Sequence, residues 1–440
     1  MPIAHDPASV ILACGALAAL ALLVAVFVRF PATGIGLLMA GQCTALVFGS
    51  PTAVVCGLNL SSVDILVAAA MLATGVNLAL HHRGHPNLQR CLLWVLCAVV
   101  LGSLLSGMAT HGLQTAGNDA RVPFLWVFGP GLYVVTARPS QDLTVVVVRT
   151  WTAMATLYAV STVAWWWRFG VGSSSSQVMV AGHLVSGRGL PAAAALLIAQ
   201  AAVMRLALRG TRPRALLLTI PLLLVVLLMQ HRSAWTATAA MISGWLLLRP
   251  GRVVPKAITA AATALVGVIA VAVATALPTS RLTVDLTESA SDGSSWHWRV
   301  MGWQQLIGRL HGPRDWLFGL PFGSGYERFT GTVFTGVNPH SYYVLMLLRT
   351  GIVGLALLSL IVVTSLGACG LRTRAGLLMW LLAAGEVAFS LTYEPSLPDG
   401  LLLGLLVRCA AQATAGPPLP APRRRSVPPA ADAPLPEHVA

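Results

Sequence analysis

The chain consists of long apolar runs separated by short polar segments, and about thirteen of the runs approach the roughly 20 residues that a helix needs to cross a bilayer. The runs are continuously apolar rather than alternating, which excludes an outer-membrane barrel. Helices therefore do the spanning, because a helix satisfies its own backbone hydrogen bonds in lipid. The predicted spans are residues 8–28, 32–49, 62–80, 91–109, 123–137, 143–167, 190–208, 215–229, 234–248, 255–277, 341–368, 375–392 and 400–413.

The composition supports an all-α polytopic integral membrane protein with about 12–13 transmembrane helices. Only 10% of the 440 residues are charged and 56% are hydrophobic, whereas about a quarter of the residues in a soluble domain are charged. This composition excludes a cytosolic enzyme, a disordered chain and a small disulfide scaffold. The seven cysteines lie in or beside apolar runs without the paired spacing of a zinc site, so we interpret them as apolar packing residues.

The basic residues predict how the chain is oriented. The net charge is +14, but the basic residues fall between apolar runs rather than along one helix face, so nucleic acid is not an expected partner. One alternating assignment places nearly all of them on one side of the membrane, which we expect to be the cytoplasm. The basic positions on that side are Arg29, Arg83, Arg90, Arg138, Arg209, Arg212, Arg214, Arg249, Arg252, Lys256, Arg372, Arg374, Arg423, Arg424 and Arg425. The extracytoplasmic side then receives residues 118–119, 173–176, 231–232, 278–340 and 394–395.

The spacing of the spans divides the chain into four parts. Residues 1–277 hold about ten transmembrane helices, and residues 341–415 hold about three more. Residues 278–340 form one long extracytoplasmic loop. Residues 416–440 are rich in proline and carry a basic cluster, a composition that cannot bury enough apolar surface to fold, so we expect a disordered cytoplasmic tail.

The long loop itself contains a predicted helix. Residues 298–310 carry apolar side chains at spacings of three and four, which predicts an amphipathic helix lying on the membrane surface. The apolar positions are Val300, Trp303, Leu306, Ile307 and Leu310. Residues 318–325, which follow, are rich in glycine and are expected to form turns.

Several motifs in this region resemble the O-antigen ligase and polymerase family. They are Trp298-Arg299 ahead of a helix at 304–310, Phe318-Gly319, Gly323-Ser324-Gly325, and Asn338-Pro339-His340-Ser341-Tyr342-Tyr343 running into Leu348-Arg349-Thr350-Gly351-Ile352-Val353-Gly354-Leu355. Upstream, Gln230-His231-Arg232-Ser233-Ala234-Trp235 is similar to the family motif in which an arginine opens a span. The resemblance implies a polytopic glycosyltransferase of the GT-C type in the cytoplasmic (inner or plasma) membrane, which takes a glycan from a polyprenyl-diphosphate carrier on the extracytoplasmic face.

The same resemblance implies a site composed of His340, Arg299 and Arg232, with no metal ion or cofactor. The residue types suit the chemistry. Negative charge accumulates on a departing diphosphate, and guanidinium groups can neutralise it with paired hydrogen bonds. A histidine whose pKa lies near neutrality can accept the proton of the incoming hydroxyl. The acceptor is expected to be a glycan, a lipid or a protein, and ligation and polymerisation both stay open.

Two positions depart from the family pattern. Ser341 stands where the family commonly has asparagine, and Arg349 stands where it commonly has an acidic residue. Arg349 is expected either to add a third phosphate contact or to pair with a carboxylate such as Glu386, and the two interpretations stay open.

The sequence also allows a second function, transport of a solute or an anion. Asp64, Arg149 and Glu386 lie inside predicted spans, where charges are expensive, and many spans with internal charges also suit a solute or anion transporter. A carrier keeps its essential charges near the bilayer midplane. The candidate residues here gather instead at the predicted outer rim, which favours the glycosyltransferase.

Overall fold

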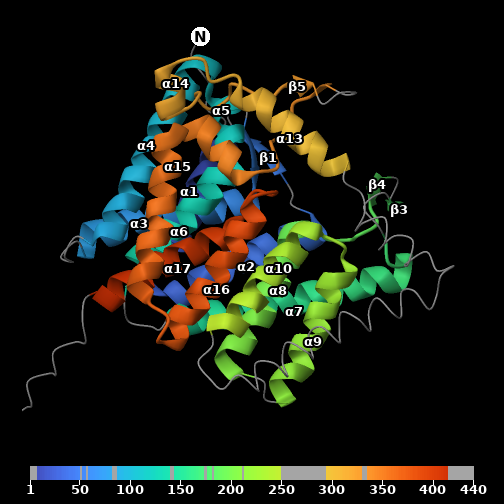
Figure 1. The fold of residues 1–440 in the computed structure, drawn as a ribbon. Helices are drawn as coiled ribbons and strands as arrows, with labels where there is room; N and C mark the ends of the chain where they lie inside the picture. The colour runs from blue at the N-terminus through green and yellow to red at the C-terminus, as the bar shows by residue number, and fades with distance from the viewer. Residues whose placement is uncertain are drawn as a thin grey trace, which may run out of the picture.

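The structure is a computed structural model that describes residues 7–49, 52–55, 58–81, 87–138, 143–172, 176–180, 183–210, 213–248, 294–329 and 334–414. These residues are mostly helical (Figure 1). The helices of the N-terminal half are α1 (Pro7–Arg29), α2 (Pro31–Phe48), α3 (Ser62–His81), α4 (Leu88–His111), α5 (Leu113–Ala120), α6 (Trp126–Thr136), α7 (Leu143–Phe169), α8 (Ala192–Arg209), α9 (Pro213–Leu228) and α10 (Arg232–Leu248). The remaining helices are α13 (Ser294–Ile307), α14 (Pro313–Phe318), α15 (Tyr342–Cys369), α16 (Arg374–Ser390) and α17 (Leu397–Thr414).

The predicted spans that fall within the described residues all coincide with helices. Six of the described helices are long and apolar enough to cross a membrane, which confirms an all-α membrane protein. Those six segments are Pro31–Phe48, Ser62–Leu80, Leu88–His111, Leu143–Phe169, Ala192–Arg209 and Tyr342–Cys369. The predicted span at 255–277 and the predicted tail at 416–440 lie outside the described residues.

The structure corrects the predicted loop at residues 118–119, which lie in helix α5. Helix α5 continues through a π-helical turn, Arg121–Leu125, directly into α6. Pro123 lies in that turn. Proline lacks the N–H of a helical hydrogen bond and its ring collides with the preceding turn, and the wider π-helical turn accommodates it. The chain therefore passes from α5 to α6 without leaving helical structure.

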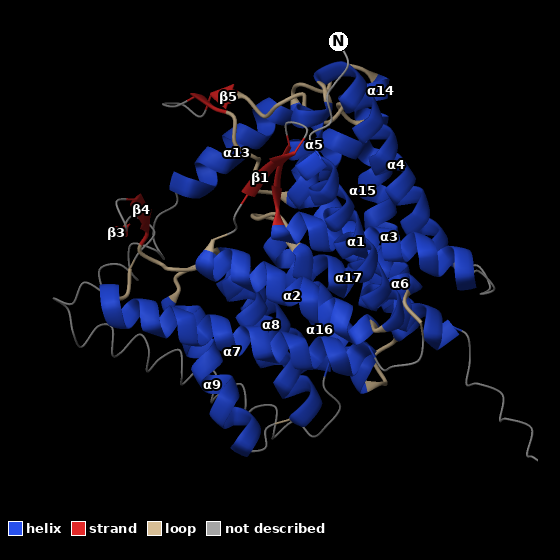
Figure 2. Ribbon diagram, turned by 180° about the vertical axis from the view of Figure 1, so that it is seen from behind, coloured by secondary structure: helices blue, strands red, loops and turns tan. Residues whose placement is uncertain are grey.

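Three short antiparallel hairpins were not predicted. They pair β1 (Thr52–Val55) with β2 (Leu58–Ser61), β3 (Gln177–Val180) with β4 (His183–Ser186), and β5 (Arg328–Phe329) with β6 (Phe334–Thr335). Each hairpin joins two helices or lies within the long loop, so the bundle remains helical. Figures 1 and 2 show α5, α13, α14 and β5 gathered at one end of the bundle.

Helix α15 is broken at Gly351, within a span that was predicted to be continuous. Gly351 has φ +66°, a conformation that favours glycine, and a Cβ atom there would collide with the backbone of Leu317. The segment after α14 lies in this break, where the Leu320 N–H donates to the carbonyl of Leu348 over 2.6 Å. The glycine-rich stretch 318–325 is thus docked against the broken helix.

The buried side chains form two clusters. The first contains residues of α1, α2, α3, α7, α8, α9, α10 and α16, and the second contains residues of α4, α5, α13 and α15. Helices α6 and α17 contribute to both, and α15 adds Leu366 to the first. The predicted amphipathic helix is observed as α13, and its side chain Leu306, together with Leu310 just beyond it, is buried in the second cluster. The apolar side of α13 therefore packs onto the bundle.

Candidate functional site

Two sequence-predicted residues contact Tyr393, which follows α16, and a third adjoins a residue that is bonded to its neighbour Thr392. Arg299 on α13 places its guanidinium carbon 5.5 Å from the centre of the Tyr393 ring. The imidazole of His340, immediately before α15, lies 6.2 Å from the same ring. Arg232 begins α10, and the next residue, Ser233, hydrogen-bonds through its hydroxyl to Thr392. The helices thus bring Arg232, Arg299 and His340 to one end of the bundle.

The backbone ahead of His340 is held by groups from two other elements. Trp303 on α13 donates its indole N–H to the Pro339 carbonyl over 2.6 Å. Arg328 on β5 donates to the carbonyl of Val337 over 2.6 Å and to that of Asn338 over 3.3 Å. Because donors from α13 and β5 hold these carbonyls, the backbone that leads into His340 is fixed in position.

Asn338 connects the same segment to the loop after α16. Its side-chain amide donates to the carboxyl of Glu394 over 2.9 Å. Burial raises the pKa of Glu394, and the hydrogen bond from Asn338 opposes that rise. Tyr393 and Glu394 thus contact the two ends of one motif, the ring touching His340 and the carboxyl touching Asn338.

Backbone strain is concentrated at this site. Among the described residues, Gln230 and His340 are the non-glycine residues with positive φ, at +56° and +52°. The left-handed region costs an ordinary residue roughly 1–3 kcal/mol and persists where the surroundings impose it, as at many functional sites. Gln230 stands two residues before Arg232, so both strained positions adjoin the predicted site residues.

The charges around His340 favour its neutral form. Burial is the main factor that lowers the pKa of His340, and the nearby guanidinium groups of Arg299 and Arg328 lower it further. The imidazole is therefore uncharged at neutral pH and can accept a proton. Arg299 and Arg328 form no ion pair with a described carboxylate, and both charges oppose protonation of the imidazole.

Sequence reasoning missed the importance of Tyr393 and Arg328. Tyr393 stacks on Phe389 at 5.2 Å and contacts both His340 and Arg299. Arg328 is 4% exposed and lies 5.6 Å from the ring of Trp298, which is itself 6.0 Å from His340. No local pattern singles out either residue, because their roles arise from contacts between distant segments.

Arg349 lies away from this cluster, in a network of its own. Its guanidinium forms a 2.9 Å ion pair with Asp119 of α5 and donates to the Tyr326 hydroxyl and the Gly325 carbonyl, each over 3.1 Å. The side chain is fully buried. Of the two interpretations left open by the sequence, the structure supports pairing with a carboxylate. The partner is Asp119 rather than Glu386, because the stretch 318–325 bridges α5 and α15.

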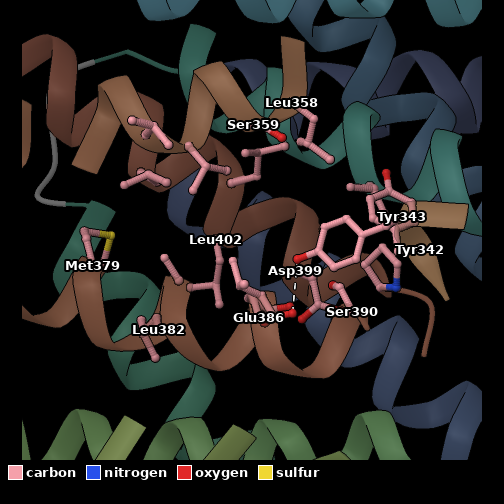
Figure 3. Close-up of a pocket in the computed structure, with 18 residues that line it drawn as sticks. Tyr342, Tyr343, Leu358, Ser359, Met379, Leu382, Glu386, Ser390, Asp399 and Leu402 are labelled. Atoms are coloured by element: carbon pink, nitrogen blue, oxygen red, sulfur yellow. Dashed lines mark hydrogen bonds between the residues drawn. The ribbon is translucent and has the colours of Figure 1, made fainter. Parts of the chain in front are cut away.

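The acidic residues inside the predicted spans also have partners. Asp64 accepts hydrogen bonds from Trp126 over 2.7 Å and from the Ser61 backbone over 2.7 Å, and caps the start of α3. Glu386 on α16 accepts a hydrogen bond from Gln200 on α8 and is hydrogen-bonded to Asp399 on α17 (Figure 3).

An apolar groove runs from the site along the bundle. Its volume is about 290 Å³, and α15, α16 and α17 supply nearly all of its lining. Tyr342, Tyr343 and Pro395, which follow His340 and Glu394 in sequence, are among its lining residues. Glu386 and Asp399 lie close together on its wall (Figure 3). Val363 and Val387 also line the groove and are 66% and 48% exposed, so the groove opens onto the outer surface of the bundle.

Comparison with known proteins gives no family assignment: no protein-family model matches the chain, and no curated protein matches its sequence. The resemblance to the O-antigen ligase and polymerase family rests on the motifs, and the structure adds the spatial arrangement of the residues that carry them.

Proposed function

We propose that this protein is a membrane glycosyltransferase that moves a glycan from a polyprenyl-diphosphate carrier to an acceptor on the extracytoplasmic face. The observation that carries the proposal is that His340 and Arg299 both contact Tyr393, that Arg232 precedes the residue bonded to Thr392, and that an apolar groove lies nearby. A neutral base, fixed cations and a channel for hydrocarbon are the three features that such a substrate needs.

The proposed step is a direct displacement. The hydroxyl oxygen of the acceptor attacks the anomeric carbon of the donor sugar, and the bond between that carbon and the phosphate oxygen breaks. The proton of the hydroxyl passes to His340, and the bonding electrons leave with the polyprenyl diphosphate. Arg299 and Arg232 stabilise the departing diphosphate, because planar guanidinium groups can donate paired hydrogen bonds to its oxygens. The imidazolium then loses its proton to water.

The groove would hold the first part of the hydrocarbon chain of the carrier. Its lining is mostly apolar, it includes Tyr342 and Tyr343, which follow the proposed base in sequence, and it opens toward the surface that lipid would cover. A carrier lipid diffusing in the bilayer could therefore bring its diphosphate to the arginines without leaving the membrane.

The orientation follows from the same proposal. The protein would cross the cytoplasmic membrane about 12–13 times, a count that the apolar stretches of roughly 20 residues support. The end of the bundle that carries α5, α13 and α14 would face outward, and the C-terminus would lie in the cytoplasm, the side to which the sequence assigns the basic residues.

A transporter would depend on charged residues inside the membrane rather than on the residues around Tyr393. Its intramembrane charges would be Asp64, Arg149 and Glu386. Asp64 is engaged in capping α3, Glu386 is hydrogen-bonded to Gln200 and Asp399, and Arg149 is exposed on α7. These contacts give the first two residues structural roles, so the glycosyltransferase is the function that the site supports better.

The test is to incubate the purified chain with a synthetic polyprenyl-diphosphate-linked oligosaccharide and an acceptor glycan. We expect wild-type protein to release polyprenyl diphosphate and form an elongated or transferred glycan, and we expect His340→Ala to abolish both. His311→Ala, which removes an exposed histidine of the same loop, is the matched control and should keep full activity.

Two results would contradict the proposal. If the His340→Ala variant transfers glycan at the full rate, His340 is not the proton acceptor. If the protein takes up a solute into vesicles with saturable kinetics and forms no glycan product, the transporter is favoured.

A further inference from the structure

A second arginine lies beside Arg232, in the turn between β4 and α8. Arg188 is half-buried, and its guanidinium interacts electrostatically with both Tyr393 and Arg232. Since Arg299 and His340 contact the same tyrosine, Arg188 belongs to the same cluster in space. Arg188 lies 44 residues before Arg232 in the sequence, so the sequence does not indicate that the two arginines are close in space.

The turn that carries Arg188 is held firmly. Trp165 at the end of α7 donates its indole N–H to the Gly187 carbonyl over 3.0 Å. Gly189 has φ +78° and packs so closely against the Trp165 ring that a Cβ atom would collide with it. The Trp165 ring thus holds the backbone on both sides of Arg188. The direction of the Arg188 side chain is set by other contacts.

His231 orients that side chain. Its Nε2 lies 3.0 Å from the Leu190 carbonyl, and its Nδ1 lies 3.5 Å from Nη1 of Arg188. A carbonyl oxygen can only accept and a guanidinium can only donate. One arrangement satisfies both contacts: Nε2 carries the proton and donates to Leu190, while the Nδ1 lone pair accepts from Arg188.

The surroundings keep His231 in that neutral form. The side chain is 6% exposed, and burial, followed by the charge of Arg188, lowers the pKa of His231 to about 4. Arg188 itself stays charged: burial lowers its pKa, but the usual value of an arginine lies above about 12. Two guanidinium groups, Arg188 and Arg232, therefore lie near each other, and no described carboxylate forms an ion pair with Arg188.

A guanidinium that an uncharged support orients, and that forms no ion pair with a described carboxylate, can receive an anion. We infer that Arg188, held in place by neutral His231, is a further binding residue for the diphosphate of the lipid-linked donor and acts together with Arg232. This inference rests on the proposed function. Arg188 contacts the ligand directly, and His231 is a positioning residue that acts through Arg188.

The experiment measures binding rather than turnover. Geranylgeranyl diphosphate, geranylgeranyl monophosphate and geranylgeraniol are titrated into the purified full-length chain in detergent. We expect Arg188→Gln to weaken binding of the diphosphate at least about tenfold, the effect of one hydrogen bond to a charged group, and to leave the alcohol unchanged. The matched control is Arg168→Gln, which removes an exposed arginine at the end of α7 and should change neither affinity.

Inorganic pyrophosphate is the second arm of the same experiment. It should displace geranylgeranyl diphosphate from wild-type protein. Its dissociation constant, calculated from the competition with each variant's own affinity for the lipid, should be higher for Arg188→Gln than for wild type if the arginine binds the diphosphate itself. An unchanged affinity for pyrophosphate in Arg188→Gln overturns the inference.

A double-mutant cycle tests the role of His231. His231→Leu should weaken diphosphate binding as much as Arg188→Gln does, and the double variant should be no weaker than either single variant, because both remove one interaction. His231→Asn should retain most of the affinity, because its amide oxygen can replace Nδ1 as the acceptor. Additive losses in the cycle contradict the positioning role.

The outcomes separate this inference from the proposed function. If wild-type protein binds the diphosphate through Arg188 but transfers no glycan, the proposed function fails and the binding site stands. If wild-type protein transfers glycan while Arg188→Gln binds the diphosphate as wild type does, only the inference fails. Should Arg188→Gln fail to fold, Arg188→Lys keeps the charge and the stem, and it should weaken the diphosphate more than the monophosphate because it lacks the planar fork.

Discussion

The imidazole of His340 lies between the rings of Trp298 and Tyr393 and close to two guanidinium groups. Aromatic rings limit its rotation, and the positive charges oppose its protonation. Both effects suit a proton acceptor, since a base must be correctly placed and must be uncharged before the reaction begins.

The lowered pKa of His340 predicts the pH dependence of glycan transfer. The neutral form is present above the lowered pKa and is lost as the pH falls through it, so kcat/KM should decline only below the usual histidine value of about 6.5. Arg299→Gln removes one cause of the lowering and should move this decline toward higher pH. The pH profile of kcat/KM checks both expectations, with Arg314→Gln, an exposed arginine of α14, as the control. A decline that moves toward lower pH contradicts the electrostatic account.

Arg349 should behave as a structural residue. Removing one partner of a buried ion pair leaves the other charge unpaired and costs about 3–5 kcal/mol, so Asp119→Asn and Arg349→Met should each lower the free energy of unfolding by that order. Chemical denaturation in detergent measures the loss, with the exposed Arg314→Met as control. The folded fraction should bind geranylgeranyl diphosphate as wild type does. If Arg349→Met binds geranylgeranyl diphosphate more weakly while its free energy of unfolding is unchanged, Arg349 contacts the phosphate instead.

Some site residues could be predicted from the sequence and others could not. Arg232, Arg299 and His340 occur in ordered motifs, and the helices bring them together. Tyr393 and Arg188 occur in no such motif, because each gains its role from a partner far away in sequence. The partner of Arg349 was also out of reach, since Asp119 was predicted to lie in a loop.

At the scale of elements, apolar length predicted where helices lie but not where they break. Continuous hydrophobicity gives the same signal across α15 whether or not Gly351 interrupts it, and glycine is common in transmembrane helices. The break depends on the segment after α14, which inserts its backbone there. The π-helical turn at Pro123 depends likewise on a local backbone adjustment that hydropathy does not record.

The groove between α15, α16 and α17 predicts a dependence on lipid length. Ser359→Trp should fill part of the groove and raise KM for a long polyprenyl carrier more than for a short one, with little change in kcat. Leu360→Trp, on the same helix but outside the groove, is the matched control. Steady-state kinetics with two carrier lengths provide the measurement. Equal effects of the two substitutions would argue against a lipid-binding groove.

At the scale of the whole molecule, the proposed orientation is open to chemical labelling. In a cysteine-free background, His311→Cys lies in the loop expected outside and Arg372→Cys in the turn expected inside, and both positions are exposed. A membrane-impermeant maleimide should label His311→Cys in intact cells and Arg372→Cys only after permeabilisation. The reverse pattern would invert the topology and place the site in the cytoplasm.

The two clusters of buried side chains divide the site between them. Arg232 and Tyr393 are attached to helices of the first cluster, whereas His340 and Arg299 are attached to α15 and α13 of the second. The groove is lined by α15, most of whose buried side chains belong to the second cluster, and by α16 of the first, together with α17, which contributes to both. A shear of the two bodies by about 1 Å would separate proton acceptor from leaving group far enough to slow a positioned reaction roughly a hundredfold. In the proposed glycosyltransferase, a hydrocarbon chain held in the groove would therefore act on the reacting geometry itself, and transfer would be sensitive to which lipid the bilayer inserts there.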